Sequence, residues 1–230
     1  QVAIVKFAGD ENNRVGNDKY RDGQYTHNYS QVMKASGACT SDTAAAFKSV
    51  VSSIEPAGAT RADNGMKVAG DERCASKRAD AQKIVVFFTD GTPTSFSEFD
   101  PEVASAGVAA AKAMKDTGAL VYTIGIFSGT DSSADPTDNR TSNENKFMQA
   151  VSSNYPDAPY SPDWWNNYSW SFGTRVENAA FYKTATNADK LKTIFNDISK
   201  EISDAAGYPT DVTEGAENES GYVTFTAQLG

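Results

Sequence analysis

Residues 83–88 (KIVVFF) form the segment that most constrains the fold of this chain. After the lysine, every residue is apolar and either β-branched or aromatic. The apolar residues do not alternate with polar ones, which is typical of a strand covered on both faces. The run stops at Thr89-Asp90-Gly91, a combination that favours a turn. We therefore expect a buried strand in a sheet that lies between layers of helices.

Weaker patterns on both sides of this run alternate between strands and helices. Further strands are predicted at residues 2–7, 29–34, 119–127 and 181–185. Helices are predicted at residues 42–54, 60–73, 100–117, 145–152 and 187–202, with Ser41 or Asp42, Asp100 and Asn187 as N-caps. Residues 9–28 are polar and predict a loop. This alternation predicts an α/β fold with a mostly parallel central sheet and helices on both faces.

Composition excludes several classes of partner. The chain has 230 residues, of which 39% are hydrophobic, and this is enough for one substantial core. Its net charge of -9 argues against nucleic acid or an anionic membrane as partner. No apolar run approaches the roughly 20 residues that span a bilayer, so we expect no membrane insertion by this segment. The chain also lacks a signal peptide at its start, which suggests a mature or excised piece of a longer protein.

Two cysteines and one histidine limit the chemistry that the chain can perform. Cys39 precedes the first predicted helix of an antiparallel pair and Cys74 ends the second, so a disulfide between them is one expectation. Two separate thiols are the alternative. A disulfide would indicate an oxidising compartment. The single histidine, His27, lies in a polar stretch and offers little basis for a Ser-His-Asp triad.

Asp90 and Thr60 are the candidate metal ligands. In parallel α/β sheets, ligands bind beyond the carboxyl ends of the strands, and Asp90 directly follows the clearest strand. Thr60 lies between two predicted helices and is expected at the same rim. Hard divalent cations prefer oxygen ligands, and Mg²⁺ uses few protein groups because it keeps several waters. An Asp-Gly pair is also a common turn, so this pattern alone leaves an ordinary turn as the alternative.

Several separated segments, in this order and spacing, resemble von Willebrand factor A domains. They are VAIVKFAGD (2–10), GATRADNGMKVA (58–69), KIVVFFTDGTPT (83–94), GALVYTIGIF (118–127) and NADKLKTIFNDI (187–198). The chain is most similar to the A domains of Gram-positive bacterial surface adhesins and pilus-tip proteins. For those domains NKFMQAVSSNYP (145–156) and GTRVENAAFYKTATNADKL (173–191) are also typical.

The resemblance implies a Rossmann-like sheet with a metal-ion-dependent adhesion site at its carboxyl edge. Thr60 and Asp90 match the threonine and the second aspartate of that site. An intact domain would hold Mg²⁺, Mn²⁺ or Ca²⁺ and bind an acidic group of a protein or host extracellular-matrix ligand. The resemblance also implies a secreted or cell-wall-anchored location. It assigns residues 1–204 to the A-type domain and residues 205–230 to a tail or linker into a following domain.

The family's Asp-x-Ser-x-Ser motif is missing from this chain. The nearest string, Asp131-x-Ser133-x-Asp135, follows the wrong strand. Residues 2–7 resemble the family's second strand, so the first strand and helix are missing too, and this chain alone offers the metal only Thr60 and Asp90. Three explanations are open. The first segment could stay bound as a separate peptide, it could have been cut away, or residues 222–226 could fill its place.

Two loops are possible additional binding sites. Residues 155–170 hold all three tryptophans, and a ligand-contact loop of Trp164, Trp165, Tyr168 and Trp170 is one interpretation, since Trp and Tyr are enriched at interfaces. Packing of these aromatics onto their own domain is the other. Residues 131–144 have carboxylates at alternate positions that could hold Ca²⁺, but they lack the glycine and final glutamate of an EF-hand, which favours a solvated acidic loop.

Three functions follow from these patterns. The first is a cell-surface ligand-binding or adhesion module with a metal at Asp90. The second is a structural pilus or surface-protein scaffold without a functional metal site. The third is a metal-dependent hydrolase, which we rank last because the chain has no phosphate-binding Gly loop and no nucleophile elbow. We therefore expect a protein that is not an enzyme.

Overall fold

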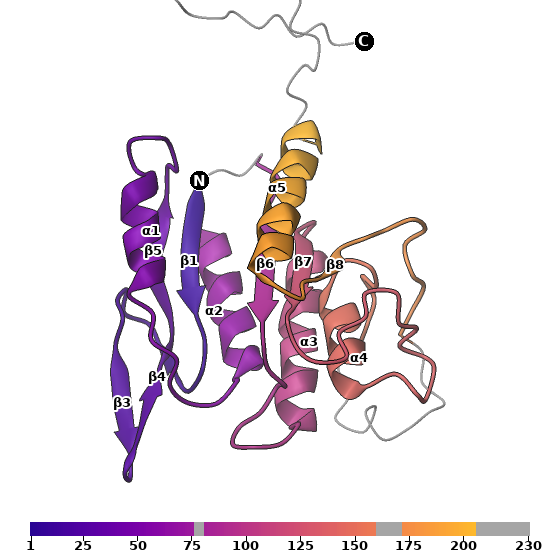
Figure 1. The fold of residues 1–230 in the computed structure, drawn as a ribbon, viewed down its shortest axis with the longest axis horizontal. Coiled ribbons are helices and arrows are strands. Elements are labelled where there is room, and N and C mark those ends of the chain that lie inside the picture. Colours follow the sequence, from indigo (N-terminus) through magenta and orange to yellow (C-terminus); the bar gives the residue numbers. More distant parts are fainter. Residues whose placement is uncertain (76–80, 160–171, 206–230) are drawn as a thin grey trace, which may run out of the picture. The chain divides into compact units, whose positions relative to one another are not determined.

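The structure is a computed structural model that describes residues 1–75, 81–159 and 172–205. The chain divides into two compact units, Gln1–Thr186 and Asn187–Gly230. The first unit contains all the described strands and helices α1 to α4, and the second contains helix α5 (Figure 1). Among the described residues, no helix is both long enough and apolar enough to cross a membrane.

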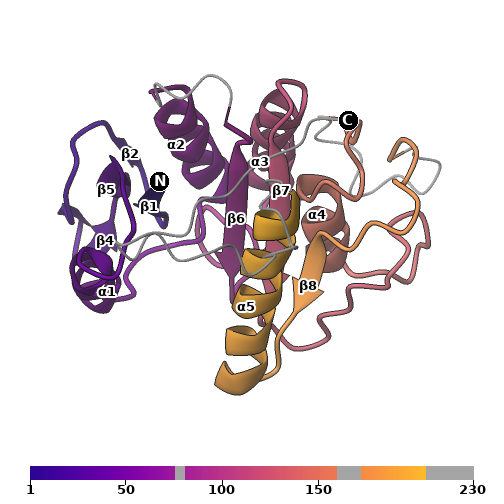
Figure 2. The same ribbon diagram turned by 90° about the horizontal axis from the view of Figure 1, so that it is seen from above.

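Strands β6 (Ile84–Thr89), β7 (Leu120–Gly125) and β8 (Tyr182–Thr184) form a parallel sheet in that order. Helices α3 (Pro101–Lys115) and α4 (Asn143–Val151) connect these strands. Figure 2 shows α2, α3 and α4 along one face of this sheet. The predicted strands and helices of this region are confirmed, as is the α/β class of the fold.

The start of α3 shows how local sequence determines a helix boundary. The carboxylate of Asp100 accepts hydrogen bonds from the backbone N–H groups of Glu102 and Val103, at 2.9 and 3.2 Å. Pro101 occupies the first helical position, where a missing N–H costs nothing. The predicted N-cap is confirmed.

The main N-terminal sheet has a different construction from the β6–β7–β8 sheet. Strand β1 (Val2–Lys6) pairs antiparallel with β5 (Ser30–Gly37), and the short β2 (Glu11–Asn12) pairs parallel with β5. A hairpin of β3 (Lys19–Asp22) and β4 (Tyr25–Asn28) forms a second sheet. The prediction of a loop at residues 9–28 is therefore wrong.

The hairpin was missed because its strands are polar and largely exposed, so they show no apolar alternation. Its turn did carry a signal, since Gly23 is the first residue of the two-residue loop between Asp22 and Tyr25, where a type II′ hairpin turn favours glycine. Gly23 has φ +57°, a conformation that glycine adopts at little steric cost.

Helices α1 (Ala44–Ser52) and α2 (Ala62–Ala75) follow β5. The N-cap of α1 is Thr43, and its side chain does not cap the helix, so the predicted Ser41 or Asp42 cap is wrong. The Thr43 hydroxyl instead donates to the carbonyl oxygen of Ala38 at 2.8 Å. Helix α2 packs against β1 and β5 and also against α3, which joins the two halves of the first unit.

The prediction of one central sheet is wrong for the described strands, and a Rossmann-like sheet with helices on both faces stays a prediction. The described strands form separate sheets, and β1 and β6 lie on either side of a groove without pairing. On β6, Phe87 is buried, whereas Val86 and Phe88 are 36% and 40% exposed. The apolar run therefore reflects a strand whose second face is only partly covered in the structure.

The hydrophobic core lies mainly between the β6–β7–β8 sheet and the helices on its face. Its largest side chains include Phe147, Met148 and Val121, each no more than 1% exposed. The rings of Phe87 and Phe147 meet edge to face with centroids 6.0 Å apart. The N-terminal sheet contributes only the partly buried Phe7 to the margin of this core.

The second unit contains α5 (Ala188–Ala205). The side chain of Asn187 accepts a hydrogen bond from the backbone N–H of Lys190 at 2.8 Å, as the predicted N-cap should. The apolar residues of α5 recur at helical spacing, at Leu191, Ile194 and Ile198. The predicted boundary between residues 204 and 205 remains a prediction.

Candidate metal and ligand site

The carboxyl ends of β1 and β6 meet the loop that precedes α2. The carbonyl oxygen of Ala8, just after β1, accepts a hydrogen bond from the backbone N–H of Arg61 at 3.0 Å. The loop after β6 is joined to the same segment through Thr60 and Thr94. The two strands therefore run in the same direction, as their arrows show in Figure 1.

Thr60 is held by a pair of backbone hydrogen bonds. Its N–H donates to the Thr94 carbonyl oxygen at 3.2 Å, and the Thr94 N–H donates to the Thr60 carbonyl oxygen at 3.1 Å. A Cβ atom added to Gly91 would lie 3.2 Å from Thr60 Oγ1, so the threonine hydroxyl lies beside the residue that follows Asp90. The structure thus brings the two predicted ligands to the same rim.

Asp90 presents a carboxylate that is free to bind a ligand. The residue is exposed, and within the described part of the chain its carboxylate has no hydrogen bond or ion pair. Its neighbour Thr89 is buried and fixes the turn, because Thr89 Oγ1 accepts from the Gly91 N–H at 3.2 Å. A rigid turn with an unpaired carboxylate is what a cation site at a strand end requires.

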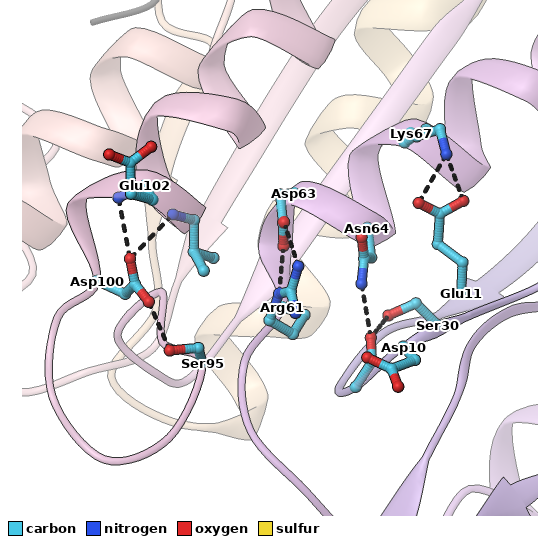
Figure 3. A network of polar contacts seen from close by, with 12 residues as sticks. Asp10, Glu11, Ser30, Arg61, Asp63, Asn64, Lys67, Ser95, Asp100 and Glu102 are labelled. Atoms are coloured by element: carbon cyan, nitrogen blue, oxygen red, sulfur yellow. Dashed lines mark hydrogen bonds and ion pairs between the residues drawn. The ribbon is translucent and has the colours of Figure 1, made fainter. Parts of the chain in front are cut away.

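An arginine beside the two candidate ligands was not anticipated from the sequence. Arg61 forms two parallel hydrogen bonds with Asp63, from Nε at 3.0 Å and from a terminal nitrogen at 2.8 Å (Figure 3). This bidentate pair, together with the charges of Asp10 and Asp100, raises the pKa of Arg61.

Two other acidic groups near this rim, Asp100 and Glu11, are engaged by their own neighbours. Burial alone would raise the pKa of Asp100, but hydrogen bonds from Ser95 and from the first N–H groups of α3 lower it. Glu11 is paired with Lys67 at 2.6 Å. Figure 3 shows these contacts spread along the rim. Asp90 is therefore distinguished from Asp63, Asp100 and Glu11 by its free carboxylate.

Thr60 and Asp90 supply two oxygen ligands, which fits half of a divalent-cation site. Within residues 1–75, 81–159 and 172–205, no group of three or more His, Cys, Asp or Glu side chains could hold a metal. Mg²⁺ keeps several waters and binds through one or two carboxylates, so two protein oxygens suit a weak site. Further protein ligands would have to come from another segment.

Residues 131–142 form a loop whose aspartates accept hydrogen bonds from within the loop, whereas Glu144, in the first turn of α4, accepts one from the Thr92 hydroxyl at 3.1 Å. Asp131 Oδ1 accepts from the N–H and hydroxyl of Ser133, and Asp135 Oδ1 accepts in the same way from Thr137. The hydrogen bonds of Ser133 lower the pKa of Asp131. Arg140 pairs with Asp138 and lowers the pKa of Asp138 to about 2. These contacts agree with a solvated acidic loop better than with a Ca²⁺ site.

The other predicted site residues fall outside this rim. Cys39 is a free, exposed cysteine, so the structure does not support the expected disulfide, and the side chain of Cys74 lies outside the described residues. The proposed contact loop, with Trp164, Trp165, Tyr168 and Trp170, also lies outside them.

No protein-family model matches the chain, and no curated protein matches it in sequence. Among solved structures, the pilus adhesin SpaC from Lactobacillus rhamnosus GG, in its open conformation, is similar with a TM-score of 0.44 and 18% sequence identity. The match covers 71% of this chain but only 21% of that adhesin's chain. A TM-score of this size does not define a shared fold, so the relationship to von Willebrand factor A domains stays a prediction from the sequence.

Proposed function

We propose that the chain is a ligand-binding module of an extracellular adhesin and that it works through a divalent cation held by Thr60 and Asp90. The cation would complete its coordination with an acidic group of a protein or host extracellular-matrix ligand. The observation that supports this most is the free carboxylate of Asp90 at the carboxyl end of β6, in a loop whose next residue, Gly91, lies beside the Thr60 hydroxyl.

The physical basis is the behaviour of hard cations. Mg²⁺, Mn²⁺ and Ca²⁺ take oxygen ligands, and a partly hydrated ion can exchange a water for a carboxylate of a second protein. Thr60 would contribute its hydroxyl and Asp90 its charge. The turn through Thr89 and Gly91 fixes the backbone on both sides of Asp90, so the residue that carries the carboxylate is in position before the ion binds.

Binding is favoured over catalysis by the residues that surround the rim. The single histidine, His27, stacks on Tyr20 in the β3–β4 hairpin, with ring centroids 5.2 Å apart. A hydrolase would need a base beside a nucleophile, and the carboxylates of Asp63, Asp100 and Glu11 near the rim are already paired. The alternative is a surface scaffold without a metal. Removal of divalent cations with EDTA would not change the interactions of such a scaffold, and this distinguishes it from the metal-dependent binding module.

Calorimetric titration of the 230-residue chain with MnCl₂ tests the metal site. Asp90→Ala should weaken Mn²⁺ binding by at least roughly 10-fold, since even outer ligands of metal sites contribute 10- to 100-fold in affinity. Glu98→Gln is a matched control, because it removes an exposed carboxylate from the loop that follows β6 without touching the proposed ligands. It should leave the affinity unchanged.

Equal affinities for the wild-type and Asp90→Ala chains would show that Mn²⁺ binds elsewhere. Absence of detectable binding in the wild-type chain would show that Thr60 and Asp90 are not enough to form a site. Either result would remove the metal from the proposal and leave the scaffold as the better account.

A further inference from the structure

Three dipeptides of the chain consist of an aspartate or asparagine followed by glycine, and the fold holds them in different ways. They are Asp22-Gly23, Asn64-Gly65 and Asp90-Gly91. The first lies in the turn of the β3–β4 hairpin, the second in α2, and the third in the loop after β6. Because glycine has no side chain and adopts many backbone conformations, its nitrogen can approach the preceding side chain more easily than that of any other residue.

Such a dipeptide supports one covalent reaction without an enzyme. The glycine nitrogen attacks Cγ of the protonated aspartic acid side chain, so that an N–Cγ bond forms, the C–OH bond breaks, and the N–H proton leaves with the hydroxyl as water. Solvent water then opens the five-membered succinimide. Opening at Cγ restores aspartate, whereas opening at the backbone carbonyl carbon gives isoaspartate, whose main chain runs through Cγ. From asparagine the leaving group is ammonia.

The hairpin turn leaves the nitrogen of Gly23 free for this reaction. Among the residues that the structure describes, no hydrogen bond involves the Gly23 N–H. Asp22 is exposed, and a Cβ atom added to Gly23 would meet nothing within 4 Å beyond its chain neighbours. The turn therefore has both a free nitrogen and the space in which the ring can close.

The loop after β6 holds the same dipeptide in a closed arrangement. The Gly91 N–H donates to Thr89 Oγ1 at 3.2 Å, and Thr89 Oγ1 donates to the Gly91 carbonyl oxygen at 3.2 Å. Thr89 is buried, and a Cβ atom on Gly91 would lie 3.2 Å from Thr60 Oγ1. The nitrogen of Gly91 can reach Cγ of Asp90 only after the hydrogen bonds to Thr89 break.

The asparagine dipeptide is protected by the helix that contains it. The Gly65 N–H donates to the Arg61 carbonyl oxygen at 3.1 Å. The buried Asn64 carboxamide donates to the Gly9 carbonyl oxygen at 2.9 Å. Helix α2 has to open before this ring can close, so the reaction at Asn64 reports unfolding around α2.

We propose that Asp22 is a site of spontaneous isomerisation to isoaspartate and that the Thr89 hydroxyl protects Asp90 from the same reaction. Isoaspartate at position 22 adds one backbone atom to a two-residue hairpin loop, which disturbs the pairing of Asp22 with Tyr25 at the hairpin tip. At position 90 it would move the carboxylate away from the end of β6. Thr89 prevents this whether or not a cation binds, so the inference does not depend on the metal site.

Incubation of the 230-residue chain in ¹⁸O-labelled water at mildly acidic pH, followed by peptide mapping with mass spectrometry, tests the proposal. Each ring opening incorporates one solvent oxygen, so the label counts passages through the succinimide at each site. The rate at each site is divided by the rate at the same site in the urea-unfolded chain. Asp22 should react within about threefold of its unfolded rate, whereas Asp90 and Asn64 should react at least roughly 10-fold more slowly than theirs.

Two substitutions of Thr89 test its protective role. Thr89→Val removes the hydroxyl from a side chain of similar shape and should raise the rate at Asp90 by roughly 2- to 10-fold, the effect of losing one hydrogen bond. Thr89→Ser keeps the hydroxyl and should react as the wild-type chain does. Asn64 is the internal control, since its rate should be the same in all three proteins.

A rate at Asp22 that falls as far below its unfolded value as the rate at Asp90 would overturn the reactive site in the hairpin. Equal rates at Asp90 in the wild-type and Thr89→Val chains would overturn the protective role of Thr89. An increase at Asp90 that Asn64 shares would also overturn it, because unfolding would then be the cause. None of these outcomes depends on the Mn²⁺ titration, which tests the metal site separately.

Discussion

The two edges of strand β6 have different environments. On the β7 side, β6 is paired along its whole length, and the sheet packs with α3 and α4 around side chains that are almost fully buried. On the β1 side, an apolar groove takes the place of a neighbouring strand. One edge of β6 is thus paired with a neighbouring strand, and the other edge faces a groove. The difference shows that, among the described residues, strand pairing and core packing fix one edge of β6 and leave the other edge uncovered.

The largest expected effect is a difference in the free energy of unfolding between two Phe→Ala variants. One phenylalanine lies in the core on the β7 side of β6, and the other lies on β6 itself. Phe147, in the hydrophobic core, is 1% exposed, and Phe88, on β6, is 40% exposed. Phe147→Ala should lower the free energy of unfolding by about 3–5 kcal/mol, whereas Phe88→Ala should lower it by less than ~1 kcal/mol, because its cavity opens to solvent. Urea denaturation of the two variants measures both. Similar losses would mean that β6 is equally buried on both sides.

Lys115, in α3, is a second buried residue on the β7 side of β6. Its ammonium donates to the carbonyl oxygens of Ala150, Ser152 and Tyr155, at 2.7, 3.2 and 2.8 Å, in the last turn of α4 and just beyond it. Lys115→Met should cost about 1–3 kcal/mol of stability, because it leaves these buried acceptors without a donor. Thermal or urea unfolding at pH 7 measures this loss. A neutral effect would show that water can replace the ammonium.

The same residue predicts a pH dependence. Burial lowers the pKa of Lys115 to about 7, whereas the unfolded chain keeps its ordinary value of 10.5. Between these values the unfolded state binds more protons, so the native state gains stability as pH rises through 7. The stability difference between wild type and Lys115→Met should grow by up to ~1.4 kcal/mol per pH unit above pH 7. A difference that stays constant from pH 6.5 to about 9 would contradict this shift.

Two glycines of α2 give the smallest and most direct contrast. A Cβ atom on Gly65 would lie 2.6 Å from Phe7 Cβ at the groove, and one on Gly70 would lie 3.6 Å from Met114 on the core side. Gly70→Ala should therefore stabilise the chain by up to ~1 kcal/mol through helix propensity. Gly65→Ala should destabilise it by about 1–3 kcal/mol through overpacking. If both substitutions are stabilising, Phe7 can move freely into the groove.

Sequence patterns predicted the β6–β7–β8 sheet and its helices well. The apolar runs of β6 and β7, and the Asp100-Pro101 start of α3, are local signals that specify an element without reference to its neighbours. Their parallel order follows from the alternation of strands and helices. For the same reason Thr60 and Asp90 were expected at one rim, and the structure places them there.

The arrangement of β1 beside β6 and the β3–β4 hairpin could not be predicted in the same way. Whether β1 pairs with β6 is a non-local question, and the apolar run of β6 looks the same with or without a neighbour. The β3–β4 hairpin was missed because exposed polar strands have no apolar alternation, although Gly23 marked its turn. The Arg61–Asp63 pair depends on the orientation of the α2 N-terminus, which spacing alone does not give.

Paramagnetic broadening by Mn²⁺ tests the proposed site most directly. In NMR spectra of the 230-residue chain, substoichiometric Mn²⁺ should first broaden the amide signals of Gly91 and Arg61, the neighbours of Asp90 and Thr60. Signals of residues 131–144, the other acidic loop, should broaden only at much higher concentration. Broadening that begins in residues 131–144, or that leaves Gly91 and Arg61 unchanged, would contradict a cation site at the carboxyl end of β6.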